Sequence, residues 1–144
     1  EKSFKVLPNV TIEKDDRDCL VIHAPNISDG PIVTNDLVDL LSETEFTFLG
    51  RLDNVINSGG IKFSPEKIEE KLSKLIADRR FFIAGIPDAD LGEKLILAIE
   101  GEKYDLPTTL FEKLDKYEKP KEVVFVPQFK ETGNGKIIRK DSLL

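Results

Sequence analysis

A lysine that follows two glycines near the end of the chain is the residue best suited to chemistry with an anion. The stretch 133–136 reads Gly-Asn-Gly-Lys, and Arg139 and Lys140 follow closely. A glycine-rich backbone that presents the flexible ammonium group of Lys136 suits a phosphate or carboxylate ligand. A P-loop is excluded, because that motif needs Ser or Thr after the lysine and Ile137 stands there. The alternative interpretation is a charged tail without a ligand.

A second glycine cluster lies in the middle of the chain, after a charged turn. The stretch 50–53 reads Gly-Arg-Leu-Asp, and Ser58, Gly59 and Gly60 follow the β-branched pair at 55–56. Glycine permits positive φ and close backbone approach. This region therefore predicts a hinge and then a glycine-tipped hairpin that another part of the chain or a ligand approaches closely. A surface hairpin without a ligand is the simpler interpretation of the two glycines alone.

Other reactive side chains do not form a site. Cys19 and His23 are the only cysteine and histidine, but four positions along a strand separate them by about 13 Å, at roughly 3.3 Å per residue. That distance is too long for a catalytic pair, so we expect a buried thiol and an ordinary histidine. The acidic cluster at 15–18 lacks the glycine and the distal glutamate of a calcium loop, which indicates a solvated turn. We predict no metal site formed by the protein alone.

The elements that must position these residues differ between the two parts of the chain. Up to residue 50, short apolar runs alternate with turn clusters, a pattern typical of strands. We predict strands over 5–10, 19–24, 32–33 and 46–49. Four short strands are a weak independent domain, so we expect this part to complete a larger sheet or barrel.

Helix and strand signals alternate in the remainder. A helix is predicted to begin at Ser64-Pro65-Glu66, and a second to run over 107–117. Strands are predicted over 80–86, 95–100 and 123–126. The expected fold is therefore a small α+β domain, with a three-stranded sheet, two covering helices and the glycine-tipped hairpin. The apolar faces of the helices comprise Ile68, Leu72, Leu75 and Ile76 in the first and Leu110, Phe111, Leu114 and Tyr117 in the second.

Charge divides the chain at the same place. The net charge of -6 lies entirely in residues 1–50, which hold 4 basic and 10 acidic side chains against 17 and 17 in residues 51–144. With a pI near 4.9, the chain lacks the basic face that nucleic acid requires. No stretch approaches the roughly 20 apolar residues of a membrane span. A single cysteine and no export signal predict a cytoplasmic protein.

Four motifs, taken in order, resemble the carboxyl-terminal part of the AMP-forming acyl-CoA synthetases and related adenylate-forming enzymes. In that family a Thr-Gly-Asp element, a Gly-Arg-x-Asp element, a glycine pair and a Gly-Lys-Ile-x-Arg element recur in this order. They read here as Thr34-Asn35-Asp36, Gly50-Arg51-Leu52-Asp53, Ser58-Gly59-Gly60 and Gly135-Lys136-Ile137-Ile138-Arg139.

The resemblance implies that the chain is the end of a longer enzyme. Residues 1–50 would then be the β-rich end of a large amino-terminal adenylation domain, and residues 51–144 a mobile carboxyl-terminal lid. The missing part of the amino-terminal domain would be the partner of this lid. The fragment alone is expected to be inactive.

The resemblance also implies the substrates and the site residues. The substrates would be a carboxylic acid, ATP with its bound Mg²⁺, and CoA. The implied roles are catalysis of adenylation for Lys136, contact with the ATP ribose for Asp36 and Arg51, the hinge for Asp53, and passage of the CoA pantetheine arm for Ser58, Gly59 and Gly60.

The chain departs from the family pattern at three places. Asn35 replaces a common glycine, Asn57 replaces a common lysine, and Phe129-Lys130 replaces a proline followed by a basic residue. The Asn57 difference puts a charged role at that position in doubt. Two alternatives remain open, namely an enzyme that loads a carrier protein and a non-enzymatic α+β interaction module.

Overall fold

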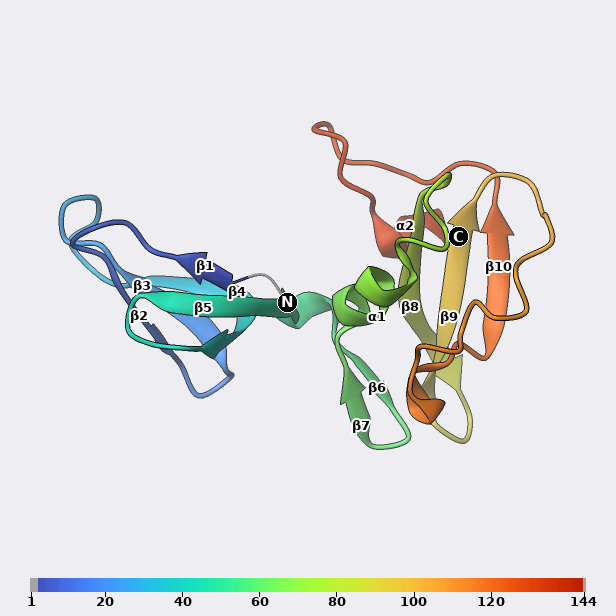
Figure 1. Ribbon diagram of the computed structural model, residues 1–144, viewed down its shortest axis with the longest axis horizontal. Helices are drawn as coiled ribbons and strands as arrows, with labels where there is room; N and C mark the ends of the chain where they lie inside the picture. Colours follow the sequence, from blue (N-terminus) through green and yellow to red (C-terminus); the bar gives the residue numbers. More distant parts are fainter. Residues whose placement is uncertain (1–2, 144) are drawn as a thin grey trace. The chain divides into compact units, whose positions relative to one another are not determined.

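The computed structural model describes residues 3–143, and the chain divides into two compact units, Glu1–Val55 and Ile56–Leu144 (Figure 1). The division falls after Val55, whereas the charge pattern places it after Gly50. The strand that ends at Arg51 pairs within the first unit, and a short 3₁₀ turn, Leu52–Asn54, follows it.

The first unit is an antiparallel sheet. Its strands are β1 (Ser3–Lys5), β2 (Thr11–Lys14), β3 (Cys19–His23), β4 (Ile32–Leu40) and β5 (Glu45–Arg51). They lie in the order β1-β5-β4-β3-β2. Its core consists of Ile12, Leu20 and Val38, against which Val6, Ile22, Leu40 and Phe46 pack.

Two strand predictions for this unit are wrong in their limits. The strand predicted over 5–10 ends at Lys5, because Pro8 and Asn9 form a turn in which Asn9 has φ 64° and Val10 N donates to Leu7 O at 3.2 Å. The sequence pattern missed β2 altogether. It also ended the third predicted strand at Val33, whereas β4 continues through polar residues to Leu40.

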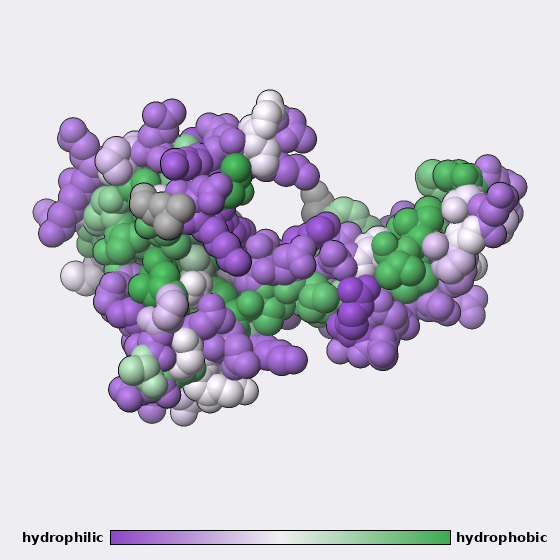
Figure 2. Space-filling model, turned by 180° about the vertical axis from the view of Figure 1, so that it is seen from behind, coloured by the Kyte–Doolittle hydropathy of each residue, from purple (hydrophilic) through white to green (hydrophobic). Residues whose placement is uncertain are grey.

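Apolar side chains remain at the surface of this unit, as Figure 2 shows. An exposed apolar patch of this kind commonly marks a contact with another protein element. The exposed large apolar residues of the unit are Phe4, Leu7, Ile27, Ile32, Val33, Leu41 and Phe48.

The second unit is built around the strand β9 (Gly92–Glu100). This strand pairs along nearly its whole length with β8 (Phe81–Asp88), antiparallel, and over its second half, Ile96–Glu100, with β10 (Glu122–Val126), parallel. The hairpin of β6 (Ile56–Ser58) and β7 (Ile61–Phe63) joins the same sheet through the pair Ser58↔Gly92. Helix α1 (Pro65–Leu72) follows the hairpin, and the short α2 (Arg139–Ser142) lies near the end of the chain. The α+β class expected from the sequence is confirmed.

Both faces of this sheet are covered, and period-two alternation along β8 and β9 divides the buried side chains between them. On one face, Ile83, Leu95, Leu97 and Ile99 pack with Ile56, Ile68, Leu72, Ile76, Leu110 and Leu114. On the other, Phe82 and Ala98 pack with Phe129, and Ile137 and Leu143 contact this cluster.

The second predicted helix does not form. Residues 107–115 make successive turns in which Leu110 N donates to Pro107 O and Leu114 N to Phe111 O, and a 3₁₀ helix, Lys116–Glu118, follows. These turns still bury Leu110 and Leu114, so tertiary contacts satisfy the apolar pattern without an α-helix. A segment this short gains little from helix propensity alone. Tyr117, predicted to lie on the apolar face, is 65% exposed.

Helix α1 agrees with its predicted start but not with every predicted contact. Pro65 occupies the first turn, and Ile68 and Leu72 are buried. Ser64 stands at the N-cap position, but its side chain makes no capping hydrogen bond. Leu75 lies beyond the end of the helix and is half exposed. No helix in residues 3–143 is long and apolar enough to cross a membrane.

Leu97→Ala in the middle of β9 is expected to lower the free energy of unfolding of the second unit by about 2–5 kcal/mol, because a fully buried side chain leaves a cavity. Tyr104 and Tyr117 are the only tyrosines and the chain has no tryptophan, so urea unfolding followed by tyrosine fluorescence reports on this unit. Leu75→Ala removes the same atoms from a half-exposed position and should cost less than about 1 kcal/mol. Equal losses would contradict the assigned core.

Candidate functional site

The lysine predicted to contact an anion stands in an ordered turn. Thr132 N donates to Lys136 O at 2.7 Å and Gly135 N donates to Thr132 O at 3.0 Å, while Gly135 has φ 86°. The Thr132 hydroxyl oxygen accepts from Lys136 N at 3.1 Å. Lys136 itself is exposed, and it forms no ion pair with any residue in the described range 3–143. Lys136 therefore closes a defined turn opposite Thr132, and its side chain is exposed. Thr132 is a residue that sequence reasoning missed.

The structure brings together the two residues predicted to contact a ribose. Asp36 in β4 and Arg51 in β5 are register partners, and Arg51 Nη1 donates to Asp36 Oδ1 at 2.8 Å. Both side chains are partly exposed, with relative exposures of 28% for Asp36 and 48% for Arg51. A carboxylate that accepts and a guanidinium that donates lie side by side, which suits a polyhydroxylated anionic ligand.

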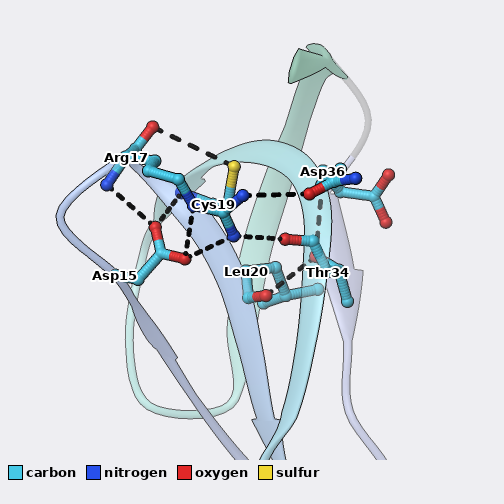
Figure 3. Close-up of polar contacts among 7 residues, drawn as sticks. Asp15, Arg17, Cys19, Leu20, Thr34 and Asp36 are labelled. Atoms are coloured by element: carbon cyan, nitrogen blue, oxygen red, sulfur yellow. Dashed lines mark hydrogen bonds and ion pairs between the residues drawn. The ribbon is translucent and has the colours of Figure 1, made fainter. Parts of the chain in front are cut away.

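Thr34 holds the backbone of this site. Its hydroxyl donates to Leu20 O at 2.8 Å and accepts from Asp36 N at 3.2 Å (Figure 3). This explains why a threonine stands two residues before Asp36. Its single hydroxyl links β4 to β3 and orients the backbone amide of Asp36.

Arg17 is a second residue that the sequence did not single out. It donates to Asp15 through Nε and Nη2, and to Thr34 O at 3.0 Å (Figure 3). It also donates to Asn35 Oδ1 at 3.0 Å. The hydrogen bonds from this guanidinium hold the pKa of the Asp15 carboxyl below its usual value. The acidic cluster was predicted to be a solvated turn. Its Asp15 holds Arg17, which in turn contacts the backbone of Thr34 and the side chain of Asn35.

Cys19 and His23 show no catalytic arrangement. Cys19 is fully buried, burial raises the pKa of its thiol, and its backbone N donates to Asp15 Oδ1 at 3.0 Å. His23 Nε2 lies 3.3 Å from Glu13 Oε1 on the neighbouring strand. The expectation of a buried thiol is confirmed. Across residues 3–143, no group of three or more His, Cys, Asp or Glu side chains could hold a metal ion.

The glycine hairpin borders a small pocket within the second unit. Gly59 and Gly60 form the turn between β6 and β7 with φ 60° and φ 82°, and Gly59 N donates to Leu91 O at 2.9 Å. The pocket has a volume of about 230 Å³. Tyr117 and Lys121 are among the residues that line it, and neither was predicted as a site residue. Its lining comprises Ser58, Gly59, Ile61, Phe63, Leu91, Tyr117 and Lys121.

The hairpin and the lysine turn lie at opposite ends of this unit. The hairpin pairs with Gly92 at the start of β9, whereas the lysine turn follows β10, whose last residue pairs with Glu100 at the end of β9. A strand of 9 residues spans roughly 26 Å at 3.3 Å per residue. Figure 1 shows the β6–β7 hairpin at one end and the segment that leads into α2 at the other.

Comparison with known proteins identifies relatives for most of the chain. No family model matches it. The 2-succinylbenzoate--CoA ligase of Lactococcus lactis is 31% identical over 110 residues, which cover 75% of this chain and 24% of that protein. The 3-oxocholest-4-en-26-oate--CoA ligase of Rhodococcus rhodochrous is 32% identical over 110 residues, which cover 72% and 20%. The chain thus spans about a quarter or less of the length of these curated relatives.

A solved structure covers nearly the whole chain. The acyl-CoA synthetase (AMP-forming)/AMP-acid ligase II-like protein of Dyadobacter fermentans is 32% identical, with a TM-score of 0.56 over 99% of this chain and 43% of its own. The chain therefore belongs to the AMP-forming acyl-CoA synthetases, with the fold of the carboxyl-terminal part of adenylate-forming enzymes. Several of its relatives are 2-succinylbenzoate--CoA ligases.

Proposed function

We propose that this chain is the carboxyl-terminal portion of an ATP-dependent, AMP-forming acid–CoA ligase. In the first half-reaction a carboxylate attacks the α-phosphate of ATP, and acyl adenylate and pyrophosphate form. In the second, the CoA thiol attacks the acyl carbon, and acyl-CoA and AMP form. One observation carries this proposal, namely that a single small unit presents a lysine turn and a glycine hairpin at opposite ends of one sheet.

The lysine turn is assigned to the first half-reaction. The approach of a carboxylate to a phosphate joins two anions, so the transition state needs a positive charge held in place. Lys136 offers three donors from an ordered turn and is free of ion pairs within residues 3–143. Asp36 would accept hydrogen bonds from the ribose hydroxyls and Arg51 would donate to the nucleotide, so that the α-phosphate is oriented for attack. Mg²⁺ would be bound by the phosphates of ATP.

The hairpin is assigned to the second half-reaction. Gly59 and Gly60 leave the turn without side chains, and a pocket of about 230 Å³ adjoins it. A thiol arm can pass close to such a backbone. Lys121 supplies a cation near the pocket for the phosphates of CoA, and Tyr117 supplies an aromatic surface.

The lysine turn must leave the reaction site and the glycine hairpin must take its place between the two half-reactions. This requires rotation of the second unit. We assign the hinge to Asp53, in the 3₁₀ turn Leu52–Asn54. The division between the compact units, after Val55, supports this place, since few-residue loop segments absorb such motions.

The first unit is assigned to the end of the large amino-terminal adenylation domain. Its exposed apolar side chains support this, because they suit a covering layer supplied by the rest of that domain. The relatives named above act, by their names, on chemically different acids. We propose 2-succinylbenzoate as the acid, and hence a cytoplasmic role in menaquinone biosynthesis, because several relatives carry that name.

The test is CoA-dependent AMP formation by the full-length enzyme that contains this chain. Given ATP, Mg²⁺, CoA and a panel of carboxylic acids, the enzyme is expected to form AMP and to prefer 2-succinylbenzoate. Preference for another acid would retain the reaction and overturn the substrate. An acyl group transferred only to a carrier protein, or no AMP with any acid, would overturn the CoA ligase assignment.

A further inference from the structure

The turn that carries Lys136 is held at its base by the end of the chain. We define the Lys136 loop as residues 130–138. Ile138 N donates to Lys130 O at 2.7 Å, which closes the loop. Lys130 N donates to Ser142 Oγ at 2.8 Å, and that hydroxyl donates to Ile138 O at 2.8 Å. The position of the loop therefore depends on what holds α2 to the body of the unit.

A largely buried ion pair makes that connection. Arg139, the first residue of α2, donates through Nη1 and Nη2 to the two carboxylate oxygens of Glu69 in α1, at 2.5 and 3.0 Å. Their side-chain exposures are 24% and 19%. A bidentate pair of this kind fixes orientation as well as distance. Arg139 also lies 5.6 Å from the centre of the Phe82 ring.

The same ion pair also forms hydrogen bonds with the free edge of β8. Within residues 3–143, β8 pairs with β9 only, so its other edge lacks a strand partner. At Ile83, which is fully buried, the backbone N donates to Glu69 Oε2 at 2.8 Å and the backbone O accepts from Arg139 Nη1 at 2.9 Å. Buried backbone groups require such partners. The pair thus joins three elements, α1, β8 and α2, at one point.

Within residues 3–143, the side-chain hydrogen bonds of Arg139 all go to the body of the unit. Its Nη1 contacts Glu69 and Ile83, and its Nη2 contacts Glu69. Burial raises the pKa of Glu69, and the hydrogen bond from Arg139 opposes that effect. Glu66 also faces this carboxylate and adds to the rise in its pKa. Removal of one partner would leave the other buried and uncompensated.

A second, more exposed ion pair, between Arg80 and Glu100, contacts the start of the loop. Arg80 donates through Nε and Nη2 to Glu100, at 2.8 and 2.5 Å, and its Nη1 lies 3.2 Å from Glu131 Oε1. Glu100 Oε2 accepts from Phe129 N at 2.8 Å. These contacts reach the segment immediately before and within the Lys136 loop.

We propose that Glu69 is a positioning residue for the adenylation half-reaction. Through Arg139 it sets where the Lys136 loop, and so the lysine ammonium group, stands relative to the rest of the unit. The inference rests on the function proposed above. Because a displacement of about 1 Å can cost about 10²-fold in rate, an anchor beyond the reach of substrate affects the chemical step.

The test uses Glu69→Gln in the full-length enzyme. Gln keeps the shape of the side chain and an oxygen for Ile83 N, but it loses the charge that holds Arg139. The rate of acyl adenylate formation at saturating ATP is expected to fall by about 10²-fold, with the KM for ATP changed by less than about threefold. Attack of CoA on preformed acyl adenylate should stay within about twofold of the wild type.

The matched control breaks another ion pair that involves α1. Lys71→Met removes the contact between Lys71 and Glu118, which are 2.7 Å apart and do not touch the Lys136 loop. It should leave both half-reactions within about twofold. Arg139→Lys keeps the charge but not the two-pronged contact, and it should lose adenylation to an intermediate degree. If Glu69→Gln does not fold, Arg139→Lys serves as the test variant in its place.

A second readout separates this inference from the proposed function. Hydrogen exchange of the full-length enzyme monitors the backbone amides of Lys136 and Ile138, whose hydrogen bonds close the loop. In Glu69→Gln their exchange is expected to accelerate about tenfold or more relative to Lys71→Met. A folded variant with unchanged exchange, or with equal losses in both half-reactions, would overturn the positioning role. Absence of AMP formation by the wild type would instead overturn the proposed function.

Discussion

Lys136→Ala in the full-length enzyme is expected to slow acyl adenylate formation by about 10²–10³-fold, the usual cost of removing one preorganised donor from a developing negative charge. The turn that carries Lys136 is closed by backbone bonds to Thr132, which alanine retains. The loss should therefore reflect the missing ammonium group rather than a misfolded loop. The measurement is the single-turnover rate of pyrophosphate release from ATP and the acid.

CoA attack on preformed acyl adenylate should remain largely intact in this variant, because the lysine is assigned to the first half-reaction alone. Lys140→Ala provides the control, since it removes an exposed lysine of α2 outside the turn. It is expected to leave adenylation within about twofold. Equal losses of both half-reactions in Lys136→Ala would refute this division of labour.

Gly59→Leu is expected to produce the reciprocal defect, with slow thioester formation and nearly normal adenylation. A Cβ at Gly59 would lie 3.4 Å from Leu91 Cδ2, so the turn can hold a side chain, but the rest of leucine would enter the adjoining pocket. We expect the rate of CoA attack on preformed acyl adenylate to fall by about 10²-fold, because misplacement of a nucleophile by about 1 Å can lower the rate by that factor.

Gly59→Ala separates bulk from backbone strain. Both variants force a side chain onto a residue with φ 60°, at a cost of about 1–2 kcal/mol in each. Only leucine fills the pocket, so alanine should retain most of the thioester rate. If alanine and leucine lower that rate equally, strain in the turn is the cause and the passage of the thiol arm is not through this pocket.

Local signals in the sequence were sufficient for several elements of the fold. Pro65 after Ser64 placed the start of α1, because proline suits the first turn of a helix. Apolar runs placed the three long strands of the second unit, since both faces of that sheet are covered and each run is bounded by turn residues. The glycines at 59, 60 and 135 all adopt positive φ, which other residues rarely do.

The family, too, was evident from the sequence. Four short motifs in a fixed order identified the AMP-forming acyl-CoA synthetases, and the relatives agree. The roles of the residues in those motifs remain predictions, since they depend on ligands and on a larger enzyme.

Other features were decided only by contacts between distant residues. Residues 107–115 have a helical apolar pattern, but packing of Leu110 and Leu114 onto the sheet needs only turns. β4 runs on to Leu40 through polar residues, because pairing with β5 rather than apolar alternation defines it. Gly85 is required because a Cβ there would approach Ile56 Cγ2 to 2.7 Å, a clash that no local rule predicts.

The candidate site likewise has features that the sequence predicts and features that only the tertiary structure shows. The sequence by itself named Lys136, Asp36 and Arg51, since their types and motif positions carry that information. Only the tertiary structure showed the partners that hold the site residues in place. Glu69 and Arg139 are separated by 70 positions, and Arg17 and Asn35 by 18. Such pairs depend on how strands and helices pack, and packing is a property of the whole unit rather than of any short stretch of sequence.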